Sequence, residues 1–368
     1  MFVKVINTIE ELQSLIPQWE GLVNNATEEN LNYEPIPLIS LLSGLDYPDW
    51  FVTCVWADEN LLGLFPMQSE PTLPLGTTHF ASLFKNHFLS CAPLVHKEHI
   101  DETLTAFWKW FNSGQDAKIF RYSEMLPNSL LAEKFVMTGN KQSATVVETM
   151  TTTRAIGTFL QGDFDEYIAN QLSAKSRSSN RSKHRKLASM GGWSSVFTSE
   201  HDEDLTQRFD DLVSVEASGW KKENGSAIEQ HENLKKHMLC MAEYAASKNR
   251  FLLANAYLGE IPVAGMYCIV NNNTLQVYKI GFNENFKAYS VGQLLLLDLI
   301  RYVIDNPAID KIDSCAVADS EMYNRCLPDQ QPVHVYQIAS NHMASKLIVK
   351  AATHTRAIRN QIRYKRAG

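Results

Sequence analysis

The chain has 368 residues, of which 45% are hydrophobic and 20% are charged, and its formal net charge at pH 7 is −7. This is the composition of an ordinary globular protein, and the acidic balance argues against general affinity for nucleic acid. No run approaches 18 consecutive apolar residues, so we expect no transmembrane segment. The start lacks a signal-peptide layout and the six cysteines are scattered, which predicts a cytoplasmic protein with free thiols.

Residues 1–150 form the first predicted domain. A strand-like start is followed by Thr8 and Glu11, the spacing of a helix capping box. Two apolar strands, 51–57 and 61–67, then meet at an acidic turn. The same strand, acidic turn and strand pattern recurs at 257–265, which indicates a duplicated fold. The alternative is a plain α/β packing domain.

A helix with charges of one sign is predicted between residues 165 and 191. No Asp or Glu occurs from Tyr167 to Ser199. Solvated helix faces usually mix both signs, so this run favours an anionic or phosphate-bearing ligand, for which we single out Arg177 and Arg181. The alternative is a solvated face. The cations of this predicted helix are Lys175, Arg177, Arg181, Lys183, Arg185 and Lys186.

Glu216 lies on or near the apolar face of the next predicted helix, 205–220. A buried carboxylate there is either an ion-pair partner or a general base with a raised pKa that takes a proton from an acceptor. Trp220 and Lys221 follow at once and are expected to form a wall of the acceptor pocket.

The stretch 251–323 organises the second half of the chain. Three apolar or aromatic runs, 251–258, 262–270 and 274–282, predict consecutive strands. Ser290 is the predicted N-cap of a helix that continues through the leucine-rich run after Gln293. A further strand is expected to end near Cys315.

This order resembles the acyl-CoA-binding part of the GNAT acetyltransferase fold. It is more closely similar to the CelD-type family linked to cellulose and exopolysaccharide synthesis, which is related to the Fem-type aminoacyltransferases. The resemblance covers roughly residues 155–340 and implies tandem GNAT-like α/β domains, the first degenerate and the second, at 151–340, complete. It rests on residues 216–221, 258–265, 290–292 and 313–323.

The resemblance implies acetyl-CoA or another acyl-CoA as co-substrate and no metal. The pyrophosphate is expected at the helix start formed by Ser290, Val291, Gly292 and Gln293, where free amides and the helix dipole favour anions. Gln293 departs from the small residue that the usual signature has at this place. The pantetheine arm is expected along the strand residues Lys279, Ile280 and Gly281.

The loop after the predicted fifth strand is the usual place for function in a parallel sheet. Asp313 is assigned to substrate binding and Asp319 to catalysis. Tyr323 is expected to protonate the departing thiolate, because the pKa of a Tyr hydroxyl lies above that of a thiol. The alternative is that Tyr323 is a packed helix residue.

The sequence therefore predicts an acyltransferase that moves an acyl group from a CoA-type thioester to an amine or hydroxyl of a small-molecule or sugar acceptor. One alternative is Fem-like transfer from aminoacyl-tRNA, with the basic helix on the RNA phosphates. Another is a non-catalytic GNAT-like binding protein. A basic C-terminal helix, 341–368, is expected to dock on the body or to make peripheral contact with anionic membrane.

Overall fold

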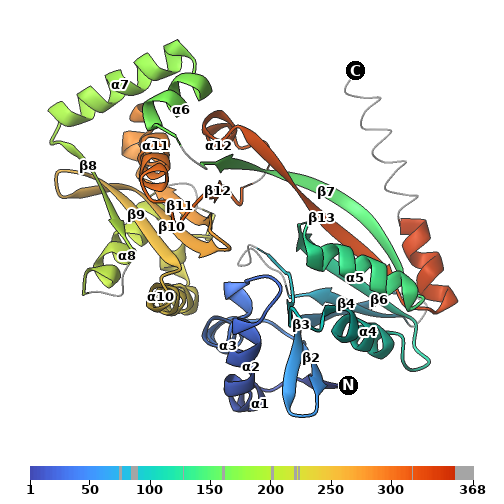
Figure 1. The fold of residues 1–368 in the computed structure, drawn as a ribbon. Coiled ribbons are helices and arrows are strands. Elements are labelled where there is room, and N and C mark those ends of the chain that lie inside the picture. Colours follow the sequence, from blue (N-terminus) through green and yellow to red (C-terminus); the bar gives the residue numbers. More distant parts are fainter. Residues whose placement is uncertain are drawn as a thin grey trace. The chain divides into compact units, whose positions relative to one another are not determined.

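The computed structural model describes residues 1–73, 77–83, 90–126, 128–159, 162–199, 203–218, 222, 224–316 and 318–352. The chain divides into two compact units (Figure 1). The first unit consists of residues 1–152 and 332–368, and the second of residues 153–331. Among the described residues, no helix is both long enough and apolar enough to span a membrane.

The first unit is a mixed sheet with helices. Its sheet has the order β1-β2-β3-β4-β6-β13, in which β4 and β6 run parallel. Thr8 caps the first helix by accepting a hydrogen bond from the Glu11 amide, as the sequence predicts. The elements are β1 (Phe2–Ile6), α1 (Ile9–Ser14), α2 (Ile16–Asn24), η1 (Leu31–Tyr33), α3 (Pro35–Gly44), β2 (Trp50–Ala57), β3 (Asn60–Leu73), β4 (Thr77–Ser82), β5 (Leu94–Val95), α4 (Ile100–Phe111), β6 (Lys118–Met125), α5 (Leu130–Lys141), β7 (Thr145–Thr158) and β13 (Asp329–Ala339).

Aromatic side chains form much of the core of the first unit. Phe107, Trp108 and Phe111 of α4 are fully buried, and Phe135 of α5 packs on Trp108 with ring centroids 4.6 Å apart. The buried indole of Trp108 donates a 3.2 Å hydrogen bond to the Phe135 carbonyl, so its polar atom is satisfied. Helices α4 and α5 therefore pack on each other through these aromatic rings.

The second unit has a sheet of the same design. Its order is β12-β11-β10-β9-β8, and the end of β7 pairs with β12 at Ile156–Thr158. Helices α6, α7 and α11 lie on one face, and α8 and α10 on the other (Figure 1). The elements are α6 (Phe164–Gln171), α7 (Ala174–Ser189), β8 (Trp193–Thr198), α8 (Glu203–Glu216), η2 (Ile228–Gln230), α10 (Glu232–Ser247), β9 (Phe251–Leu258), β10 (Ile261–Asn271), β11 (Thr274–Phe282), η3 (Glu284–Tyr289), α11 (Val291–Ile304), β12 (Lys311–Asp313) and α12 (Glu321–Cys326).

The two units repeat one topology, as predicted. Each has four antiparallel strands in sequence, then a helix, then a strand parallel to the fourth: β4 with β6, and β11 with β12. The predicted second domain ends at residue 340, whereas the second unit ends at Gln331. The reason is that β13, the last strand of the chain, pairs with β6 of the first unit.

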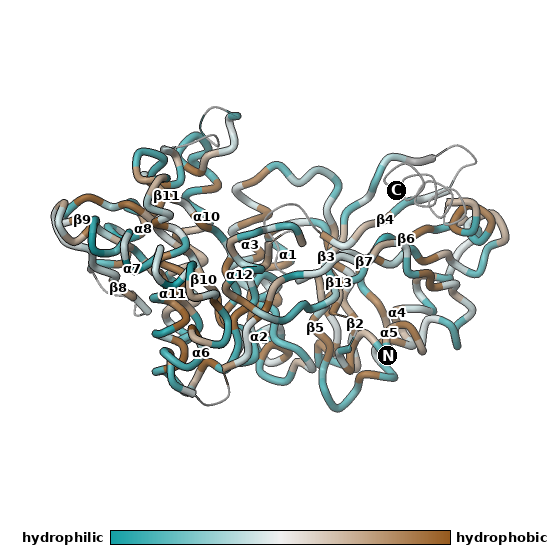
Figure 2. The backbone as a smooth tube through the Cα atoms, turned by 90° about the horizontal axis from the view of Figure 1, so that it is seen from above, coloured by the Kyte–Doolittle hydropathy of each residue, from teal (hydrophilic) through white to brown (hydrophobic). Residues whose placement is uncertain are grey.

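Two basic helices are predicted from the sequence, one at 165–191 and one at 341–368. The first is described in full as part of α6 and α7, and the second only in part. Helix α7 is hydrophilic along its length, and only Leu187 of its residues is buried (Figure 2). The C-terminal segment is helical at 343–352, where Val349 is buried against Ile119 and Ala339 of the first unit. The rest of the predicted tail helix, 353–368, lies outside the described residues.

Candidate functional site

The parallel strands β11 and β12 part soon after they begin. β12 pairs with β11 only at Thr274–Gln276. A β-bulge follows at once, because Tyr267 of β10 faces Lys279 whereas Cys268 faces Val277, which leaves Tyr278 as the extra residue. Bulges occur often beside active sites, where they redirect a strand and end its pairing. The parting of two parallel strands therefore makes room at the carboxyl end of β11.

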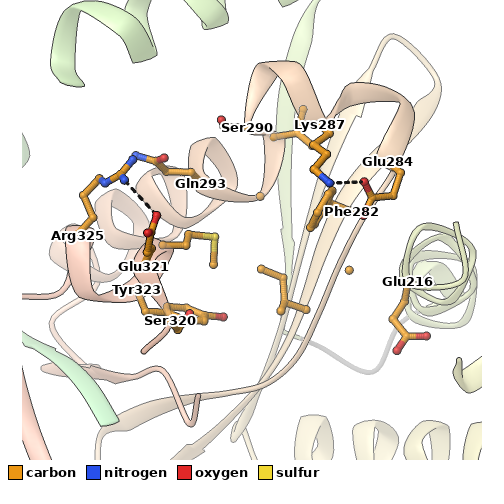
Figure 3. Close-up of a pocket in the computed structure, with 15 residues that line it drawn as sticks. Glu216, Phe282, Glu284, Lys287, Ser290, Gln293, Ser320, Glu321, Tyr323 and Arg325 are labelled. Carbon is orange, nitrogen blue, oxygen red and sulfur yellow. Dashed lines mark ion pairs between the residues drawn. The ribbon is translucent and has the colours of Figure 1, made fainter. Parts of the chain in front are cut away.

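A pocket of about 640 Å³ lies at this place (Figure 3). It is formed by the end of β11, the start of α11, the helix α12 and the end of α8. All of these elements belong to the second unit. The sequence-predicted residues that line it are Glu216, Ile280, Gly281, Ser290, Val291, Gly292, Gln293 and Tyr323.

Ser290 shapes the start of α11 with its backbone. It adopts the left-handed conformation, with φ of 54°, and its carbonyl accepts hydrogen bonds from the amides of Gln293 and Leu294. The predicted side-chain cap is wrong. The Ser290 hydroxyl instead accepts a 2.7 Å hydrogen bond from Nζ of Lys183 on α7. A cation from the basic helix therefore stands at the helix N-terminus.

The first turn of α11 is open to an anion. It contains no acidic residue, and the first amides of a helix have no intrahelical partner. A Cβ placed on Gly292 would meet its nearest neighbours at 3.7 and 3.8 Å, which is ordinary contact. The fold thus does not require glycine here. Gln293 is 8% exposed and its polar side chain lines the pocket.

Glu216 ends α8 on the opposite side of the pocket from Gln293 and Arg325 (Figure 3). Its side chain is buried, and Oε2 accepts a 3.0 Å hydrogen bond from the Ile228 amide. Gly281 makes this approach possible, because a Cβ there would lie 2.6 Å from Cα of Glu216. Gly281 therefore has a packing role besides its place in the pocket wall.

Tyr323 lies in α12 and is buried where it lines the pocket. Burial raises the pKa of its hydroxyl, and the nearby thiols of Cys268 and Cys315 raise it further. The Tyr323 phenol is therefore protonated at neutral pH, and the raised pKa makes it a weaker acid than a solvent-exposed Tyr.

The other predicted catalytic and donor residues lie outside this pocket wall. Asp319 is exposed in the loop before α12. Lys279 precedes the lining residues of β11, and its ammonium lies 5.6 Å from the Tyr278 ring centroid. Neither side chain is brought to the pocket with Glu216 and Tyr323.

The predicted substrate-binding residues have separate surroundings. Arg177 donates hydrogen bonds of 2.8 and 2.6 Å to the carbonyls of Ala169 and Leu172, so it caps the end of α6. Arg181 is exposed on α7. Trp220 and Lys221 lie outside the described residues.

Asp313 is held in a buried ion pair. Its Oδ2 lies 3.5 Å from Nη1 of Arg154, and its Oδ1 accepts a 2.8 Å hydrogen bond from the Cys315 amide. Cys315 has φ of 48°, so the carboxylate fixes the left-handed turn by which the chain leaves β12. These contacts give Asp313 a structural role.

Sequence reasoning missed several residues of the pocket. Lys183 was visible in the basic run, but only the fold brings it to Ser290. Two ion pairs lie at the pocket, Lys287 with Glu284 at 3.5 Å and Arg325 with Glu321 at 3.7 Å (Figure 3). Their members are close in sequence, yet nothing in the sequence places them beside Gly292. The other missed lining residues are Phe282, Ser320 and Met322.

Residues 174–322 match the acetyltransferase (GNAT) domain family. The matched segment contains α8, the strands β9–β11, α11 and most of the pocket wall. This segment of the second unit is therefore similar to a GNAT domain. No curated protein sequence matches the chain significantly.

Solved structures with little sequence identity share the fold. FemX has a TM-score of 0.53 at 12% identity, with 94% of this chain and 99% of FemX covered. The C-terminal domain of a putative lysylphosphatidylglycerol synthetase from Agrobacterium fabrum has a TM-score of 0.50 at 10% identity, with 94% and 97% covered. A tandem GNAT protein from the clavulanic acid biosynthesis pathway has a TM-score of 0.46 at 12% identity, with 92% and 99% covered. With the repeated topology, the predicted tandem GNAT-like α/β fold is confirmed.

Proposed function

We propose that the second unit transfers an acyl group from a CoA-type thioester to an amine or hydroxyl of a small-molecule or sugar acceptor. The observation that carries this proposal is the pocket at the start of α11, which has Glu216 and Tyr323 on its walls. The pocket lies where β11 and β12 part, within the segment that matches the GNAT domain.

The donor phosphates would bind at the first turn of α11. The amides of Val291 and Gly292 and the helix dipole favour an anion there. Lys183, already bonded to Ser290, adds a positive charge, whereas Lys287 of the pocket wall is paired with Glu284. The side chain of Gln293 adds a buried polar group to the pocket wall. The acyl-bearing arm would then follow Ile280 and Gly281 along β11 towards α8.

The chemistry follows from the two groups on the walls. The acceptor nitrogen or oxygen attacks the thioester carbonyl carbon while Glu216 takes its proton. The carbon–sulfur bond then breaks, and the leaving thiolate takes the proton of Tyr323. The products are an acylated acceptor and free CoA, and proton transfer through water restores both side chains. The Tyr323 hydroxyl keeps its proton at neutral pH because burial raises its pKa, so the proton is present when the thiolate leaves.

Turnover assays test this function. Release of free CoA thiol from acetyl-CoA and longer acyl-CoAs would be measured with a panel of amine and sugar acceptors. We expect acceptor-dependent thiol release with at least one acceptor class, and mass spectrometry should find the acylated product. Binding of acyl-CoA without any turnover across the panel would instead support a non-catalytic GNAT-like protein. The CelD-type assignment and the cytoplasmic location remain predictions from the sequence.

A second candidate, transfer from aminoacyl-tRNA, is favoured by one observation. Helix α7 carries no acidic residue, and its cations Lys175, Arg181, Arg185 and Lys186 are exposed. Such a surface suits a polyanion. Binding of tRNA that weakens steeply with salt would support this candidate, since released counterions drive such binding. An absence of tRNA binding at low salt would remove it.

A further inference from the structure

The first unit contains a group of metal-ligating side chains that the acyl-transfer chemistry does not use. His96, Glu98 and His99 follow β5 and precede α4. Their candidate ligand atoms all lie within 4.8 Å of one another. The two imidazole rings are tilted towards each other, with centroids 5.1 Å apart. The family resemblance implies no metal, so this group of side chains is not predicted from the sequence.

The backbone of this segment is fixed by neighbouring elements. The His96 amide donates a 2.9 Å hydrogen bond to the Leu62 carbonyl of β3, and Ala26 forms a β-bridge with His96. The Lys97 amide donates a 2.8 Å hydrogen bond to the Asn25 carbonyl. The His99 amide then turns back to the His96 carbonyl at 3.0 Å. These bonds hold the three side chains on one side before any ion arrives.

The side chains of this segment can approach a shared ion. The Glu98 amide donates a 3.3 Å hydrogen bond to Nδ1 of His96, which turns that ring towards Glu98. Glu98 is exposed and both histidines are half-buried, so their side chains can rotate to close the remaining distance. Ligands of a tetrahedral Zn²⁺ ion stand about 2.0–2.2 Å from the metal.

Charges of both signs lie near these side chains. The positive end of α4 and Lys97 oppose a cation, whereas Asp101 and Glu102 in the first turn of α4 favour one. A cavity of about 530 Å³ adjoins the three side chains and is also lined by Glu59 and Asn60. This cavity leaves room for water in the remaining coordination position.

We propose that His96, Glu98 and His99 bind a divalent transition-metal ion, with Zn²⁺ the best match. Zn²⁺ binds to sites made of two imidazoles and one carboxylate. Mg²⁺ and Ca²⁺ prefer oxygen ligands, so a site with two imidazoles does not suit them. The ion would join the segment after β5 to the start of α4 within the first unit. The proposal does not depend on the acyltransferase activity.

Isothermal titration of the full chain with Zn²⁺ alone, at pH 7.5 after chelator treatment, tests this site. We expect one ion per chain and a higher melting temperature with Zn²⁺, while Mg²⁺ gives neither. His96→Ala and His99→Ala should each weaken binding by more than roughly 10-fold, the lower limit for loss of even an outer partner. Glu98→Gln changes an exposed position that does not endanger folding, and it should also weaken Zn²⁺ binding.

A matched control is His184→Ala, which removes an exposed histidine of α7 in the second unit. It should bind Zn²⁺ as the unaltered protein does. Absence of Zn²⁺ binding would overturn the proposal. So would binding that survives both His99→Ala and Glu98→Gln in proteins whose circular dichroism is unchanged, because the ion would then sit elsewhere.

Discussion

The two units place a helix after the fourth strand of the same topology, yet the two helices begin in opposite electrostatic surroundings. Helix α4 of the first unit has Asp101 and Glu102 in its first turn. Helix α11 of the second unit has no acid there, and Lys183 is bonded to its N-terminal Ser290. Carboxylates at the N-terminus of a helix interact favourably with the helix dipole and repel a phosphate. The comparison shows that helices at the same place in a repeated topology can begin with opposite charge.

The largest expected effect is the loss of turnover when the carboxylate of Glu216 is removed. Glu216→Gln keeps an oxygen for the Ile228 amide but removes the base, so kcat should fall by about 10²–10⁴-fold while donor affinity changes little. Glu28→Gln is the matched change in the first unit, where burial raises the pKa of Glu28. Steady-state kinetics should show normal turnover for that control. Equal loss in both variants would remove the distinction between the units.

The close contact between α8 and β11 gives the next effect. Gly281→Ala places a methyl group 2.6 Å from Cα of Glu216, so the end of α8 must move. Misplacement by about 1 Å can cost about 10²-fold in rate, and overpacking costs about 1–3 kcal/mol of stability. Gly21→Ala in α2 is the control, because a Cβ there meets nothing within 4 Å. Kinetics and chemical denaturation measure both effects; a fully active Gly281→Ala protein would contradict the assigned role of Glu216.

Lys183 gives a smaller effect confined to donor affinity. Lys183→Ala should raise the Kd of acetyl-CoA by about 10-fold, the scale of one charged hydrogen bond. Lys186→Ala is the matched change on the same helix, at an exposed position, and should leave the Kd nearly unchanged. Titration at two salt concentrations checks this. A similar loss in both variants would mean that α7 acts through its overall charge rather than through the contact with Ser290.

Acidification should lower the stability of the first unit, and this is the smallest of the expected effects. Burial lowers the pKa of His79, and burial with His99 lowers that of His96. The folded state then binds fewer protons than the unfolded state, so the stabilisation is present above a pH of about 6.5 and is lost as the pH falls below it. Hydrogen exchange at pH 7.5 and 5.5, corrected for intrinsic rates, should show reduced protection around β4 and β5. His79→Gln should diminish the change, and an unchanged difference would exclude His79 as a source.

The sequence predicts the order of strands well because apolar and aromatic runs bounded by turn residues are local signals. The run 251–282 became β9, β10 and β11, and the acidic turn at 58–60 was enough to reveal the repeat. The start of α11 was also found, because a serine and a glycine before a leucine run mark a helix N-terminus. The side-chain cap was not, since Ser290 gives its hydroxyl to Lys183, 107 residues away in sequence.

Contacts between distant segments account for the other differences. Asp313 reads as a loop-end carboxylate, but its partner Arg154 comes from β7, far from it in the sequence. Gly281 reads as a place for the pantetheine arm, and only the packed structure shows that Glu216 requires it. The pairing of β13 with β6 of the first unit could not be predicted either, because the sequence of a strand does not show which strand it pairs with.

The most direct test is titration of acetyl-CoA into the intact protein and two reciprocal variants. Gly292→Glu gives α11 the first-turn acid that α4 has, at a position where the Cβ has room. Glu102→Gln removes an acid from α4. We predict one acetyl-CoA per chain, bound by the unaltered protein and by Glu102→Gln, with binding lost in a folded Gly292→Glu protein. Unchanged affinity in Gly292→Glu, or no binding of any acyl-CoA by the unaltered protein, would contradict a donor site at the start of α11.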